Sequence, residues 1–137
     1  MSVSISLFLF TAAISMLISL SLAWLASLIF YANVQFLKAI FPATQQLIRA
    51  HIDFLLMSIL LVVSFYLSER LTLSIPDSIV LITCFGALYN PLGFIILAIK
   101  PSMANPQTRI EKLRVLLGFL PATIGYGYIM IAVLLAL

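Results

Sequence analysis

The stretch that decides the fold is ATQQLIRAHIDFLLMSILLVVSFYL, residues 43–67. It begins with polar residues and continues as a predominantly apolar run, the pattern of a helix that enters and then crosses a bilayer. Near its start it carries the only histidine of the chain, His51, between Arg49 and Asp53. Because ionisable groups are costly inside a membrane, this cluster marks the segment as the candidate functional one.

The composition of the whole chain indicates an integral membrane protein. Its 137 residues are 64% hydrophobic and only 8% charged, whereas soluble domains carry about 25% charged residues. A spanning helix needs about 20 apolar residues, and four stretches provide them: residues 6–31, 43–67, 76–99 and 106–136. We therefore expect an all-α, single-domain bundle of four transmembrane helices over residues 1–137, embedded in a lipid bilayer and with no nucleic-acid partner. No basic residue precedes the first stretch, so we expect a retained helix and not a cleaved signal peptide.

The basic residues predict the orientation. With four spans, the first and third loops and their adjoining helix ends lie on one side of the membrane, and Arg70 lies on the other. That first side holds Lys38, Arg49, Lys100, Arg109, Lys112 and Arg114. An excess of Lys and Arg marks the cytoplasmic side, so both termini are expected outside the cytoplasm, in a bacterial inner membrane.

Turn residues predict where the helices begin. Pro42 suits the first turn of the second helix, and Ser74 suits the cap of the third, with Asp77 in its first turn. Asn105 and Pro106 suit the cap and first turn of the fourth helix.

His51 shares a face of its helix with Leu55 and Ser58, and this apolar face with a few hydroxyls suits a large flat ligand or a helix contact. Arg49 and Asp53 are four residues apart and can pair, either as an interfacial salt bridge or as part of the lining of the same cavity. Asp53 lies about 200° around the helix from His51 and is therefore not expected to bond it.

The third and fourth helices carry matching faces of small residues. These faces contain Thr83, Gly86, Asn90 and Gly93 in one helix, and Gly118, Ala122 and Gly125 in the other. Small residues let membrane helices approach closely, so the two helices are expected to pack together. Asn90 needs a partner there, either on a neighbouring helix or in a pocket towards His51. Tyr89, Tyr126 and Tyr128 supply hydroxyls, and the sequence leaves open which of them lines a cavity.

The chain has no Cys/His cluster that would hold a metal by itself. A lone histidine holds a metal only where a cofactor supplies the remaining ligands, and haem is the obvious case because one axial imidazole suffices. His51 is therefore the candidate metal ligand.

Two segments resemble the styrene oxide isomerase family of small four-helix membrane haem proteins. The first is Arg49-Ala50-His51 with the apolar run that contains Met57, and the second contains Gly86, Asn90, Gly93 and Phe94. The chain differs from the family in having residues 54–57, Phe-Leu-Leu-Met, where the family has an asparagine, and Phe85 near the family's aspartate.

The resemblance implies a haem b bound by His51, between protomers of a homo-oligomer, a trimer. Arg49 and Ser58 are the further candidates for contact with the cofactor. In the family the ferric iron acts as a Lewis acid that converts an epoxide to an aldehyde. Asn90 and Tyr89 are then the candidates to orient a small hydrophobic substrate.

Two other functions remain open from the sequence. The chain is alternatively a non-enzymatic small membrane subunit of a larger complex, with His51 and Asn90 holding helices together. It is otherwise a small transporter, for which Asp53 is the one candidate acid within the membrane.

Overall fold

The computed structural model describes residues 3–137, and this part of the chain is helical apart from its connections. The elements are α1 (Val3–Phe30), α2 (Gln35–Ile40), α3 (Gln45–Arg70), α4 (Asp77–Ile99), η1 (Pro101–Ala104) and α5 (Arg109–Ala136). Four of them, α1, α3, α4 and α5, are long and apolar enough to cross a membrane. The predicted all-α bundle of four membrane-spanning helices is confirmed.

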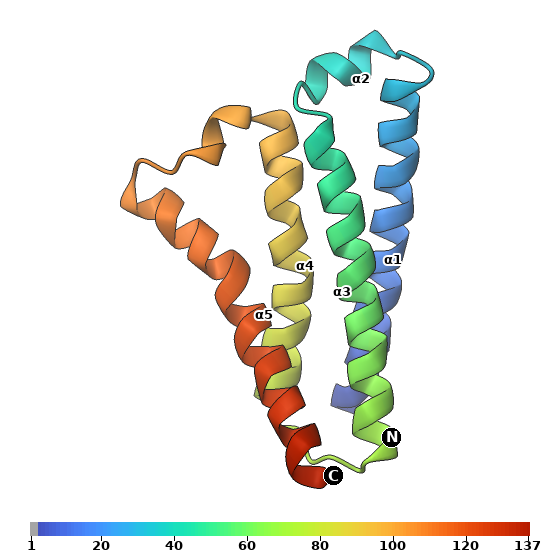
Figure 1. Cartoon of the computed structure of the whole chain (residues 1–137), viewed down its shortest axis with the longest axis vertical. Helices are drawn as coiled ribbons and strands as arrows, with labels where there is room; N and C mark the ends of the chain where they lie inside the picture. The colour runs from blue at the N-terminus through green and yellow to red at the C-terminus, as the bar shows by residue number, and fades with distance from the viewer. Residues whose placement is uncertain (1–2) are drawn as a thin grey trace.

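The long helices follow one another across the bundle in the order α1, α3, α4 and α5 (Figure 1). Helix α3 packs against both α1 and α4, and α4 packs against both α3 and α5. Both ends of the chain lie at one end of the bundle, and α2 covers α1 and α3 at the other (Figure 1). At the end where η1 lies, α5 leans away from α4 (Figure 1).

Pro42 and Ser74 do not have the predicted places at helix starts, whereas Asp77 lies in the first turn of α4 as predicted. Helix α3 begins at Gln45, so Pro42 lies outside it, in the turn that follows α2. Helix α4 begins at Asp77 after Pro76, and Ser74 makes no capping hydrogen bond. Before α4, Pro76 ends an extended connection, because the residue preceding a proline avoids the helical conformation.

The start of α5 also differs from the expected Asn105 and Pro106. Thr108 is the N-cap, and its hydroxyl accepts a hydrogen bond from the Glu111 N–H at 3.2 Å. The Glu111 carboxylate accepts the Thr108 N–H at 3.0 Å in return. This reciprocal pair is a capping box, which satisfies two of the amides that every helix start leaves free. The Thr-x-x-Glu spacing that specifies it is present in the sequence.

The core consists of two clusters stacked along the bundle. The first core cluster contains Phe8, Ala12, Leu61, Ile75, Val80, Cys84, Ala87 and Ile129. The second core cluster contains Leu22, Ala26, Ile29, Leu47, Ala50, Phe54 and Ala98. Helix α5 contributes Ile129 to the first core cluster and no buried residue to the second. The bundle is therefore built from four helices at one end and from three at the other.

Glycines account for the close contact between α4 and α5. A Cβ atom at Gly86 would collide with the backbone of Ala122, and one at Gly125 would lie 2.8 Å from the Cα of Thr83. The predicted packing of the two small-residue faces is confirmed at these positions. It is wrong for Gly93, where an added Cβ would meet no atom within 4 Å. The buried residues of α5 begin only at Gly118, so the helices separate between Gly118 and Arg109.

Candidate functional site

His51 is held against α1 by Ser19. The Nδ1 atom of His51 lies 2.9 Å from the carbonyl oxygen of Ser19 and 2.8 Å from its Oγ. The Ser19 hydroxyl donates its own proton to the carbonyl oxygen of His51 at 2.9 Å. Both Ser19 atoms therefore act as acceptors towards the ring, so Nδ1 carries the proton. In the neutral imidazole the lone pair is then on Nε2.

Asp53 is hydrogen-bonded to α4. The Asn90 side-chain amide donates to the Asp53 Oδ2 atom at 3.0 Å. Both residues are half-buried. Asn90 thus finds its partner on a neighbouring helix, the first of the two options that its position left open. The bond gives a carboxyl group within the span a donor, which lowers the cost of placing it there.

Within residues 3–137, neither Arg49 nor Ser58 forms a hydrogen bond with the ring of His51. Arg49 is exposed, and within residues 3–137 it forms no ion pair with Asp53, although their spacing permits one. The hydroxyl of Ser58 is buried and donates to the Ala12 carbonyl oxygen at 2.9 Å. Ser58 therefore uses its hydroxyl proton to join α3 to α1.

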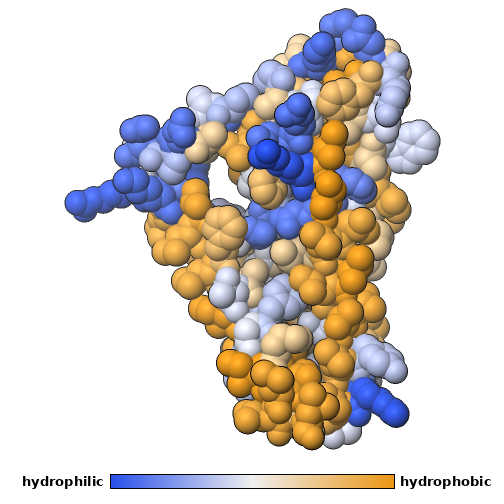
Figure 2. Space-filling view, viewed as in Figure 1, coloured by the Kyte–Doolittle hydropathy of each residue, from blue (hydrophilic) through white to orange (hydrophobic). Residues whose placement is uncertain are grey.

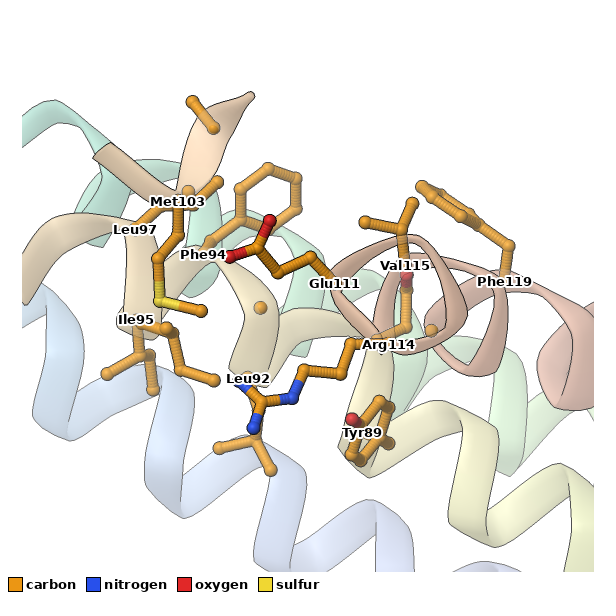
Figure 3. A pocket seen from close by; sticks show the side chains of 15 residues that line it. Tyr89, Leu92, Phe94, Ile95, Leu97, Met103, Glu111, Arg114, Val115 and Phe119 are labelled. Atoms are coloured by element: carbon orange, nitrogen blue, oxygen red, sulfur yellow. The ribbon is translucent and has the colours of Figure 1, made fainter. Parts of the chain in front are cut away.

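A cavity of about 440 Å³ lies where α5 separates from α4. Its walls are mainly apolar and come from α4, η1 and α5, including Leu92, Phe94, Met103, Val115 and Phe119 (Figure 3). We refer to it as the α4–α5 cavity. The space-filling view shows the molecule hollowed between these helices, with hydrophilic side chains gathered around the hollow (Figure 2). Its size falls within the roughly 300–1,000 Å³ of small-molecule sites.

The polar groups of the α4–α5 cavity are few and come from both helices. Tyr89 and Asn90 line it from α4, and Glu111 and Arg114 from α5. Arg114 extends across the cavity towards Leu92 and Tyr89, whereas Glu111 points towards Phe94 (Figure 3). An apolar enclosure with a few polar groups is the arrangement that fixes the orientation of a bound small molecule.

The structure brings some of the candidate residues together and separates others. Asn90 and Tyr89 share the α4–α5 cavity, but His51 does not line it. His51 bonds α1, whereas Asp53, about 200° further around α3, bonds α4. Within one copy of the chain, the imidazole and the α4–α5 cavity therefore lie on different sides of α3.

Sequence reasoning missed Ser19 and Arg114. Ser19 is one of several small residues of α1 and is fully buried, so only the packing of α1 on α3 shows that it faces His51. Arg114 was counted for topology as one basic residue among several. Its spacing of four from Ile110 and Gly118 places it on the face that continues to the buried glycine, and this signal was available.

No protein-family model, curated protein or solved structure matches the chain. The residues themselves must therefore carry any functional assignment. Within residues 3–137 no three His, Cys, Asp or Glu side chains are grouped so that they could hold a metal ion. A metal at His51 would therefore need its other ligands from a cofactor. The unprotonated Nε2 of the neutral ring suits the iron of a haem, which binds one axial imidazole.

Proposed function

We propose that this protein is a haem b-binding integral membrane protein in which His51 supplies an axial ligand. The observation that carries the proposal is the bond from His51 Nδ1 to the Ser19 carbonyl oxygen. Metal-bound histidines almost always donate their other ring N–H to a carbonyl, a carboxylate or water, which fixes the tautomer and the ring orientation. The resemblance of Arg49-Ala50-His51 to the styrene oxide isomerase family supports the same assignment.

The proposal extends to an isomerase that converts an epoxide to an aldehyde. Haem would supply a Lewis-acidic ferric iron that polarises the epoxide oxygen. On the chain itself, Ser19 holds the imidazole with Nε2 unprotonated, and Asn90 and Tyr89 offer an amide and a hydroxyl for orienting a small hydrophobic substrate.

A site that combines these groups requires more than one copy of the chain. His51 and the α4–α5 cavity lie on different sides of α3, so Asn90 and Tyr89 would approach the ligand of His51 from a neighbouring copy. We therefore propose a homo-oligomer, for which the family resemblance implies a trimer. This arrangement also predicts that a mixture of His51→Ala and Asn90→Ala chains regains activity that each variant alone lacks.

The haem assignment is tested by the absorption spectrum of the purified protein. We expect the wild type in a neutral detergent to show a Soret band, and His51→Ala to lose it because the axial ligand is gone. Ile52→Ala is the matched control, since Ile52 is the adjacent half-exposed residue and bonds nothing across the bundle. A colourless wild type, or an unchanged Soret band in His51→Ala, would contradict the assignment and favour a non-enzymatic subunit or a transporter.

The proposed localisation is a bacterial inner membrane with both termini outside the cytoplasm. The two ends of the chain lie at the same end of the bundle, and the opposite end holds α2, the end of α4 and the start of α5 (Figure 1). These segments carry Lys38, Lys100, Arg109 and Lys112. A reporter that is active only outside the cytoplasm, fused after Leu137, should therefore be active. If a reporter that is active only in the cytoplasm were active at the same position, the orientation would be the opposite of the proposed one.

A further inference from the structure

We propose that the α4–α5 cavity binds a single-chain amphiphile with a carboxylate head, such as a long-chain fatty acid. This cavity includes Tyr89 and Asn90, to which the proposed function assigns substrate orientation, but the inference does not require haem, because His51 is not part of the cavity. It begins from the shape of the site. The cavity lies at the end of the bundle where α5 contributes nothing buried to the core, so its open side lies between two helices that both face lipid.

The charge of the cavity selects an anion. Arg114 reaches across it, and within residues 3–137 its guanidinium forms no ion pair (Figure 3). The nearest candidate partner, Glu111, uses its carboxylate to accept the N–H groups of Gln107 and Thr108, at 2.7 and 3.0 Å. The Arg114 charge also acts on the Glu111 carboxylate, but within residues 3–137 the guanidinium donates no hydrogen bond. Its free N–H donors favour an anionic group with two coplanar oxygens, because their fork matches that geometry.

The walls of the cavity select an alkyl chain. Hydrocarbon side chains line it, namely those of Leu92, Ile95, Ile96, Val115 and Phe119. Gly93 also lines it, and an added Cβ there would meet no atom within 4 Å. A volume of about 440 Å³ suits a ligand of ordinary small-molecule size. One acyl chain is of that size, whereas a phospholipid carries two. A single guanidinium likewise matches one carboxylate, so a fatty acid fits the site better than an anionic phospholipid.

Photolabelling in phosphatidylcholine vesicles tests the proposal with a palmitate probe that carries a diazirine in its chain. We expect the probe to label peptides of α4 around residues 92–96 and of α5 around residues 115–119. Excess oleate should compete for the site, whereas oleyl alcohol and phosphatidylglycerol should compete far less. Arg114→Gln should lower labelling about tenfold, the size of a lost charge-assisted hydrogen bond.

Two further variants distinguish the cavity from nonspecific attraction of anions. Gly93→Leu should also abolish labelling, because the new side chain fills space that is open in the wild type and meets no atom there. Lys112→Gln should label like the wild type, since this exposed cation does not line the cavity. Equal competition by oleyl alcohol or by phosphatidylglycerol, equal loss in Lys112→Gln, or labels elsewhere in the chain would overturn the proposal.

Discussion

The Gly125→Ala variant is expected to lower the free energy of unfolding of the protein in detergent by about 3 kcal/mol, the upper part of the range for overpacked positions. An added Cβ would lie 2.8 Å from the Cα of Thr83. Thr83 has no room to move away, because it is fully buried and its hydroxyl donates to the Ile79 carbonyl oxygen at 2.6 Å. The two helices must therefore separate where they are closest.

Gly127→Ala is the matched control, because it makes the same change two residues away on the same helix. A Cβ at Gly127 would meet no atom within 4 Å. Alanine favours a helix over glycine by up to about 1 kcal/mol, so this variant should unfold at the same temperature as the wild type or slightly higher. A second pair on α4 should show the same difference: Gly86→Ala should lower the melting temperature, and Gly93→Ala should leave it unchanged or raise it slightly. Equal melting temperatures for Gly125→Ala and Gly127→Ala would show that α4 and α5 do not touch at Thr83.

The Asn90→Leu variant is expected to destabilise the bundle by roughly 2 kcal/mol, because Asp53 loses the donor that now lies 3.0 Å from its Oδ2 atom. A half-buried carboxyl group without a partner retains its desolvation penalty, and hydrogen bonds to charged groups contribute about 1.5–3 kcal/mol. Thermal unfolding in detergent, followed by circular dichroism, measures the loss.

The double variant Asp53→Leu/Asn90→Leu separates this explanation from poor packing of leucine. It removes both polar partners, so it should recover most of the stability that Asn90→Leu loses. Asn105→Leu is the control for the substitution itself, because Asn105 is exposed in the loop before α5. If the double variant were no more stable than Asn90→Leu, the Asp53–Asn90 bond would not stabilise the structure.

Composition and hydropathy alone predicted the helices of this protein, because a bilayer leaves helices as the way to satisfy the backbone of each apolar stretch. The boundaries were harder to predict. Pro42 and Asn105 have the right residue types for helix starts, yet α3 begins at Gln45 and α5 begins after Thr108. Proline and asparagine also suit the turns that precede a helix, so residue type alone does not distinguish the two positions.

The candidate site was predicted only in part. The angle around α3 correctly separated Asp53 from His51, since that angle follows from the helix itself. The partners of both residues lie on other helices, Ser19 on α1 and Asn90 on α4. The rotation of each helix about its axis is set by packing, which a single sequence does not display. The α4–α5 cavity was missed for the same reason, because the small-residue face continues to Gly93 although the contact has already ended.

Helix α5 packs on the bundle only in its C-terminal part, so its N-terminal part is free to tilt. The part of α5 from its glycine contact around Ala122 back to Arg109 is about 20 Å long, at a rise of about 1.5 Å per residue. A tilt of about 5° around this contact would move the start of α5, at Arg109, by about 2 Å. Because α5 contributes no buried residue to the second core cluster, such a tilt changes the width of the cavity while that cluster stays intact. The width of the α4–α5 cavity is therefore set separately from the packing of α1, α3 and α4.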